Sequence, residues 1–345
     1  MSLFFWKKKT ASNFQKNKAQ KNIHSVSIKV PAKLMISGEH SVIYNSKAVV
    51  CAINIFLKIK IKKISTLTII IIDGKHKYKT LLSDLSIENK NKDTVLEIIR
   101  KFFDRTKTPM CGIKIVIKNS IPIGCGLGSS SALVSGIIFG LNELFGTKKN
   151  TTELIKMATN IEHIFHGKSS GVDIQTVVKG GVVYINNDYT TKIAHQIDEI
   201  WIINTGQPSF STKNVVIDVS DNFSSSNKIW KEIGEITSDI SEIMSSREKV
   251  GIKIAHNESC LEKIGIVTES VKTFIKDLKA HEIYGKVCGA GTIAKNEVNG
   301  NSGVVGVFQK LTKEQKKYLF FLCKKNKFDI KKVYISNAGL VINCT

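Results

Sequence analysis

Glycines and serines are concentrated between residues 121 and 132, in a pattern typical of a phosphate-binding loop. Gly124, Gly126 and Gly128 would let backbone N–H groups approach an anion without interference from a Cβ atom. The serines that follow favour the start of a helix, whose N-terminus carries a partial positive charge. The segment is not a Walker A loop, because no Gly-Lys-Ser/Thr follows the glycines, and Ser129 stands where a dinucleotide loop needs its third glycine. Two interpretations stay open at this point, a phosphate loop and a structural turn.

Ionisable residues also gather around a glycine turn near the start of the chain. Lys33, Glu39 and His40 surround Gly38 between two apolar runs, where strand alternation would place fewer charges. The segment is either a solvated hairpin turn or part of a binding site.

A third concentration of acidic groups lies between residues 162 and 173. Glu162 is near the end of an apolar-faced helix, and Asp173 follows a Ser-Ser-Gly turn. Two carboxylates in one helix–loop unit could divide the work of holding a metal ion and accepting a proton. The structural alternative for Asp173 is a helix N-cap. His163 and His166 have metal-like spacing but no His-Glu-x-x-His pattern, so no zinc site is predicted.

The elements that must position these residues follow from the hydrophobic pattern. Period-two alternation predicts half-buried strands, joined as hairpins, at 56–61 and 113–117. Helical spacing of apolar residues predicts helices at 129–145 and from Thr151 to about 165. Further strands are predicted at 181–185, 199–203, 286–288, 304–308, 333–335 and 340–342, and further helices at 228–244, 253–264, 269–278 and 313–323. This order of elements, without a long linker, predicts an α+β protein.

The net charge of +22 does not by itself indicate a nucleic-acid-binding protein. Only three of the 51 basic residues are arginines, namely Arg100, Arg105 and Arg247. Nucleic-acid readers favour arginine and interleave it with aromatic residues that stack on bases. We therefore expect a lysine-rich solvated surface that attracts small anions, and no nucleic-acid partner.

The apolar runs and the cysteines bear on the location of the protein. No apolar run approaches the roughly 20 residues of a membrane-spanning helix, so no membrane partner is expected. The seven cysteines are odd in number and contain no Cys-x-x-Cys pair, which favours a reducing compartment, the cytoplasm.

The three segments occur in an order that resembles the GHMP kinases, a family of small-molecule kinases. The resemblance runs from about Val26 to the C-terminus and includes a third glycine motif at Gly289, Ala290 and Gly291. It implies a two-domain α+β fold. The N-terminal domain would have mixed and antiparallel strands with helices that carry the phosphate loop, and the C-terminal domain would be an α/β sandwich. The expected boundaries are a flexible basic extension at 1–22, an ATP-binding domain at 23–190 and a C-terminal domain at 191–345.

The resemblance also implies a reaction, the Mg²⁺-assisted transfer of the γ-phosphate of ATP to the primary hydroxyl of a small alcohol. His40 makes mevalonate the first expectation. Phosphomevalonate or a sugar is the alternative substrate, and a non-catalytic ligand-binding regulator is the alternative function. The oligomeric state is left open, with a homodimer allowed.

Roles for individual residues are carried over on the same resemblance. Asp173 would accept the hydroxyl proton, and Lys33 beside it would stabilise negative charge. Ser129 and Glu162 would hold Mg²⁺, while Glu39, His40 and Thr212 would contact the substrate. The triphosphate would be held by Gly124, Cys125, Gly126, Leu127, Gly128, Ser129 and Ser130.

Two positions depart from the family pattern. Thr292 follows Gly291 where the family continues with further glycines, and Ser169 replaces the usual proline before Ser-Gly-Val-Asp. The first change falls in a turn that is expected to pack under the phosphate loop.

Overall fold

The structure is a computed structural model that describes residues 23–86, 94–166, 170–186, 189–197, 199–244, 250–297 and 299–344. The expected N-terminal extension at 1–22 and Ser169 lie outside these residues. Within the described part of the chain, no helix is long and apolar enough to cross a membrane.

The larger of two sheets has eight strands and contains most of the first half of the chain. Its strands are β1 (Ser25–Ser37), β2 (Ala48–Ile64), β3 (Thr68–Asp73), β4 (His76–Leu81), β5 (Gly112–Asn119), β6 (Val182–Asn186), β7 (Tyr189–Ile193) and β12 (Val341–Cys344). The main order is β12-β1-β2-β5-β3-β4, and β6 pairs with both β2 and β7. Among the described strands of this sheet, every pairing is antiparallel except that of β3 with β5. The last strand of the chain thus returns to the sheet that the first strand begins.

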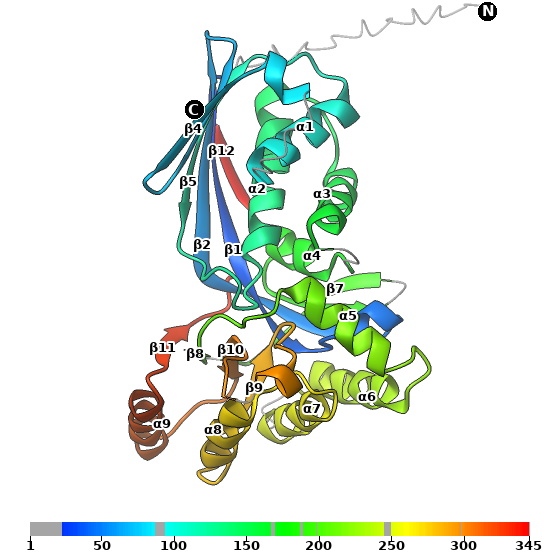
Figure 1. Ribbon diagram of the computed structural model, residues 1–345, viewed down its shortest axis with the longest axis vertical. Helices are drawn as coiled ribbons and strands as arrows, with labels where there is room; N and C mark the ends of the chain where they lie inside the picture. The colour runs from blue at the N-terminus through cyan, green and yellow to red at the C-terminus, as the bar shows by residue number, and fades with distance from the viewer. Residues whose placement is uncertain are drawn as a thin grey trace, which may run out of the picture.

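Four helices accompany the larger sheet. They are α1 (Thr94–Thr106), α2 (Ser129–Phe145), α3 (Thr151–His166) and α4 (Val172–Lys179). Figure 1 shows α1, α2 and α3 along one face of the sheet, and α2 contacts β1, β2, α1, α3 and α4. Because α2 touches elements on all sides, its sequence is apolar around most of its circumference.

The smaller sheet has four antiparallel strands in the order β11-β8-β10-β9. The strands are β8 (Ile200–Asn204), β9 (Gly285–Cys288), β10 (Val304–Val307) and β11 (Asp329–Val333). The helices of this half are α5 (Thr212–Asn222), α6 (Lys228–Ile243), α7 (Gly251–Lys263), α8 (Glu269–Lys279) and α9 (Lys313–Asn326). The described residues also form three short 3-10 helices, η1 (Ser41–Tyr44), η2 (Ser83–Ser86) and η3 (Ala294–Asn296).

The two halves meet where β1 contacts β9 and where α6 packs on β1, β2 and η1. The Ser37 and Thr237 hydroxyls hydrogen-bond across this junction at 2.7 Å. The end of β1, which leads into the turn with Glu39 and His40, therefore contacts both halves of the molecule (Figure 1).

The predicted α+β class is confirmed, and most predicted elements are observed within a few residues. One strand is misplaced, since β11 covers Asp329–Val333 rather than 333–335. The two-domain division stays a prediction. Strand β7 (Tyr189–Ile193) of the larger sheet crosses the expected boundary at residue 190, and β12 also lies in the larger sheet.

Candidate active site

The glycine-rich segment forms a tight loop that leads directly into α2. Gly126 and Gly128 have φ angles of 84° and 73°, in the left-handed region that favours glycine. A Cβ atom on Gly126 would lie 2.3 Å from the carbonyl oxygen of Cys288, and one on Gly128 would lie 2.6 Å from Cγ of Lys33. Both glycines are thus required by backbone conformation and by close packing.

The N-terminus of α2 has free hydrogen-bonding capacity. Its N-cap is Gly128, and no side chain caps the first turn. The first N–H groups of a helix lack intrahelical partners, and together with the helix dipole they favour an anion. The geometry therefore suits a phosphate group better than a purely structural turn.

Lys33 and Asp173 are brought together beside this loop, as the sequence predicts. The Lys33 Nζ lies 3.1 Å from Oδ2 of Asp173, with the lysine side chain 5% exposed and the aspartate side chain 31% exposed. The backbone N–H of Lys33 also donates to the carbonyl of Leu127 at 3.0 Å. One residue of β1 is therefore linked both to the phosphate loop and to the carboxylate on α4.

Asp173 lies in the first turn of α4, which begins at Val172. The N-cap is Gly171, with φ 73°, so the alternative that Asp173 is an N-cap is wrong. Its carboxylate instead lines a cavity that also borders the phosphate loop. The positive φ of Gly171 lets the chain turn sharply just before the helix.

Glu162 is buried on α3, and its carboxylate accepts a short hydrogen bond from the hydroxyl of Ser131. The Ser129 hydroxyl accepts from Nδ2 of Asn119 at 3.0 Å. Ser129, Ser130 and Glu162 all line the same pocket. The expected Mg²⁺ pair of Ser129 and Glu162 stays a prediction, and the structure adds Ser131 as the serine that holds the Glu162 carboxylate.

His40 lies in a turn where its backbone has a positive φ angle, which is uncommon for a residue other than glycine. Its φ is 56°, and its Nε2 lies 2.9 Å from the carbonyl oxygen of Ala290 in the third glycine motif. Its Nδ1 is buried and has no hydrogen-bond partner. Burial lowers the pKa of His40, although the bond to Ala290 and the charge of Glu39 oppose this effect. A neutral imidazole that donates from Nε2 leaves Nδ1 as an acceptor.

Glu39 lines the same pocket, but one of its oxygens has a protein partner that the sequence did not suggest. Its Oε1 accepts from Nζ of Lys286, which is fully buried on β9. The other oxygen, Oε2, is buried and unpartnered. Lys286 also donates to the carbonyl of Val287 at 2.8 Å. Glu39 therefore combines a structural ion pair with an oxygen available to a ligand donor.

The third glycine motif packs against the phosphate loop, as expected. A Cβ on Gly289 would lie 2.8 Å from Cα of Gly126. The departure at Thr292 is accommodated by hydrogen bonds, because its hydroxyl donates to Glu297 at 2.7 Å and its N–H donates to Ile266 at 3.0 Å.

Thr212 begins α5, with Ser211 as the N-cap residue whose hydroxyl accepts from the N–H of Asn214. Thr212 is exposed and lines the pocket together with the chain from Gln207 to Ser211. Gln207 was not predicted as a site residue. Its side chain lies against Gly124, where an added Cβ atom would be 2.8 Å from Nε2 of Gln207. The contact could not be predicted because Gln207 is far from the phosphate loop in the sequence.

Most of the predicted site residues surround one cavity of about 640 Å³ between the two halves of the molecule. Its lining includes Lys33, Glu39, His40, Gly124, Gly126, Leu127, Gly128, Ser129, Ser130, Glu162, Asp173, Thr212, Gly289 and Ala290. Cys125 is buried behind the loop, and Gly291 packs on Ile266, so neither lines the cavity. Among the described residues, no three His, Cys, Asp or Glu side chains are grouped to hold a metal.

Comparisons with known proteins agree with this geometry. Residues 93–181 match the GHMP kinases N terminal domain. The chain is 28% identical over 265 residues to a mevalonate kinase from Archaeoglobus fulgidus, covering 76% of this chain and 87% of that protein. It is 27% identical over 280 residues to a mevalonate kinase from Saccharolobus solfataricus, with coverages of 77% and 87%.

Solved structures extend the likeness to nearly the whole fold. The mevalonate kinase of Methanococcus jannaschii superposes with a TM-score of 0.75 and 23% identity, covering 92% of this chain and 99% of that chain. The L. major mevalonate kinase in complex with R-mevalonate gives a TM-score of 0.70 and 17% identity, with coverages of 96% and 100%.

The domain match at residues 93–181 and the fold make this chain similar to the GHMP kinases. Among these, the chain is similar to mevalonate kinases, and the resemblance predicted from its motifs is confirmed.

Proposed function

We propose that this protein transfers the γ-phosphate of ATP to the primary hydroxyl of mevalonate, giving 5-phosphomevalonate and ADP. The observation that carries the proposal is the Lys33–Asp173 pair at 3.1 Å, which faces the same cavity as the glycine loop at the start of α2. A phosphate cradle beside a lysine–carboxylate pair suits phosphoryl transfer to an alcohol. The named relatives support mevalonate as that alcohol.

The phosphate loop would bind the triphosphate through its backbone. Gly126 and Gly128 leave room for close approach, and the uncapped first turn of α2 supplies N–H donors. Leu57, Ile117 and Leu133 give the cavity apolar surface that suits a nucleobase.

Asp173 would act as the general base. Its carboxylate is partly exposed to the cavity and would take the proton from the attacking hydroxyl. Such a base typically contributes about 10²- to 10⁴-fold in rate. Lys33 would hold the carboxylate in place and offset negative charge that develops on the transferring phosphoryl group.

The residues present fit a Mg²⁺ ion. Magnesium in phosphoryl-transfer sites takes one or two carboxylates or hydroxyls, with phosphate oxygens and water completing its shell. Glu162, oriented by Ser131, and Ser129 would supply the protein ligands. When bound, the ion would neutralise charge on the β- and γ-phosphates.

Glu39, His40 and Thr212 would bind mevalonate. The unpartnered Glu39 Oε2 and His40 Nδ1 are buried polar atoms that a substrate hydroxyl could satisfy. Thr212 on α5 lines the same cavity. These contacts would turn the primary hydroxyl toward Asp173. A cytoplasmic location is a further part of the proposal, supported by seven free cysteines, and the oligomeric state stays open.

A substrate panel tests the proposal. Purified protein would be incubated with ATP, Mg²⁺ and either mevalonate, phosphomevalonate, homoserine or galactose, and ADP formation measured. We expect ADP with mevalonate at a rate well above that with the other three compounds. Faster turnover of another compound would assign a related kinase, and no turnover of any of them, with nucleotide bound, would favour a ligand-binding regulator.

A further inference from the structure

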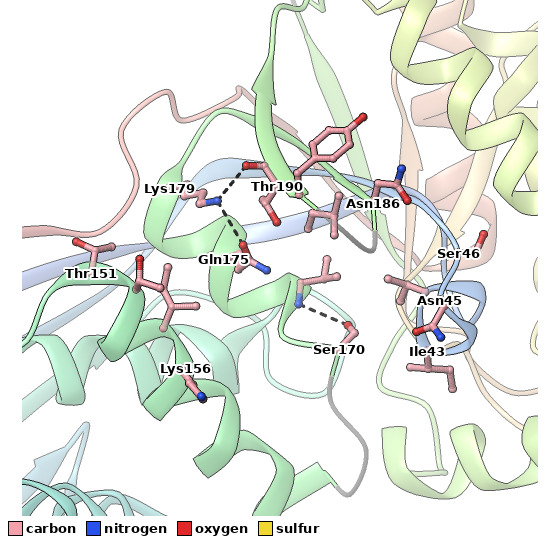
Figure 2. A pocket seen from close by; sticks show the side chains of 16 residues that line it. Ile43, Asn45, Ser46, Thr151, Lys156, Ser170, Gln175, Lys179, Asn186 and Thr190 are labelled. Carbon is pink, nitrogen blue, oxygen red and sulfur yellow. Dashed lines mark hydrogen bonds between the residues drawn. The ribbon is translucent and has the colours of Figure 1, made fainter.

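A second cavity of about 670 Å³ lies beside the first, between η1, the first two turns of α3, α4 and the β6–β7 pair. Figure 2 shows its lining side chains, with Asn45 and Ser46 on one side and Thr151 and Lys179 on the other. The two cavities share only Ile43 and Ser170 among their lining residues. The second cavity is therefore a neighbour of the active-site cavity, with a different set of functional groups.

The described lining residues of the second cavity carry positive charge and no negative charge. Lys156 and Lys179 are among these 16 described residues, and none of the 16 is acidic. Lys179 is half-buried, and its Nζ donates to Oε1 of Gln175 and to the carbonyl of Thr190, both at 3.3 Å. Both acceptors are neutral, and in the described part of the chain Lys179 has no ion pair within 4.0 Å.

The surroundings of Lys179 make an anionic ligand favourable. Burial lowers the pKa of Lys179, and the nearby charge of Lys192 lowers it further. Both effects disfavour the ammonium form of Lys179. An anion seated beside this ammonium would offset both effects, and the reduced dielectric of a partly buried site strengthens the attraction.

Other lining residues indicate an organic ligand rather than a bare ion. Asn45, Thr151 and Asn186 provide polar side chains, while Ile155 and Ile185 provide apolar surface. A cavity of this size with mixed lining is typical of a small-molecule site.

We propose that this second cavity binds a small organic anion, with the ligand's charged group held by Lys179 and its remainder between α3, η1 and β6. Such a ligand would contact Val172, the residue before Asp173, and would lie against the helix that carries Asp173. The proposal concerns binding and does not depend on the reaction proposed for the first cavity.

Calorimetric titration tests this site with two probes, 3-phosphoglycerate and succinate. The protein would first be saturated with AMPPNP and Mg²⁺, so that the phosphate loop is occupied and the probe reports on the second cavity. We expect at least one probe to bind with a stoichiometry of one. Lys179→Met should weaken that binding at least tenfold, whereas Lys179→Arg should keep it within about threefold.

The control is Lys101→Met, which also removes one half-buried cation. Lys101 lies on α1 and does not line the second cavity. It should leave probe affinity within about twofold, and far-ultraviolet circular dichroism should show all variants folded. Absence of binding by both probes to the wild-type protein would overturn the proposal. So would binding that Lys179→Met and Lys101→Met weaken equally. The preceding AMPPNP titration separately reports whether the first cavity binds nucleotide.

Discussion

Lys286 and Glu39 form a buried ion pair that joins the strand before the third glycine motif to the turn after β1. The two residues are 247 positions apart in the chain. Beside them, Glu258 accepts a hydrogen bond from the N–H of Val287 at 2.8 Å, while Lys286 donates to the carbonyl of Val287. Since His40 also bonds Ala290, the proposed substrate turn is attached at two points, once to β9 and once to the third motif.

This pair yields a prediction about stability. Lys286→Met would leave the Glu39 carboxylate buried without its cation, so we expect it to lower the free energy of unfolding by about 3–5 kcal/mol. Urea unfolding measures the change. Lys295→Met is the matched control, because Lys295 pairs with Asp218 in the exposed part of the surface and should cost less than about 1 kcal/mol. Adding Glu39→Gln to Lys286→Met should recover part of the loss, and equal effects of the two lysine variants would contradict this account.

The contact between the phosphate loop and the third motif gives a prediction about nucleotide affinity. An alanine at Gly126 would meet the backbone carbonyl of Cys288, so the loop must move, and we expect Gly126→Ala to weaken AMPPNP binding at least tenfold. Gly265 is a matched control, because its φ of 80° imposes a similar backbone strain but no atom lies within 4 Å of its added Cβ. Gly265→Ala should lose about 1–2 kcal/mol of stability and bind AMPPNP normally. Equal AMPPNP affinities in both variants would argue against a phosphate role for the loop.

Glu199 predicts the response of stability to acid. Burial would raise the pKa of Glu199, but hydrogen bonds from Lys332, Lys316, the Leu311 N–H and Trp201 together lower it to about 2. The folded-state pKa therefore lies below the ordinary value of 4.5, and the stability from Glu199 is present above pH 4.5 and lost as the pH falls toward 2.

We expect this loss to reach at most about 3 kcal/mol. Unfolding midpoints measured in urea from pH 6 to pH 2.5 would show it as a steeper decline in the wild type than in Glu199→Gln. Parallel declines in the two proteins would mean that Glu199 does not contribute to acid sensitivity.

Local patterns made part of this structure predictable. Helix α2 was placed correctly because long apolar residues at helical spacing are followed by Gly146, which adopts the left-handed conformation and ends the helix. Helix α4 was not predicted, because its eight residues are too few to show a helical repeat of apolar positions. Helix α5 buries only Val215 and Val219, so its apolar pattern is also weak. No helix was predicted at 94–106 either, although Val95, Ile98, Ile99 and Phe102 have the spacing that could have shown it.

The candidate site was predictable where its residues belong to short motifs, and less so where distant segments meet. The proximity of Lys33 and Asp173 is what the resemblance of their motifs to the GHMP kinases implies, and the structure shows the pair. The partners Ser131, Gln207 and Lys286 were missed, because each contact joins segments far apart in the chain. Lys286 had one local signal, a lysine within a strand that is otherwise buried.

The most direct test of the central claim is the turnover number of Asp173→Asn with saturating ATP, Mg²⁺ and mevalonate, compared with that of the wild type. The substitution keeps the size of the side chain and removes its capacity to accept the hydroxyl proton. We predict a loss of at least 10²-fold in turnover with AMPPNP affinity within about threefold of the wild type. Turnover near that of the wild type would contradict the role of Asp173 as the general base.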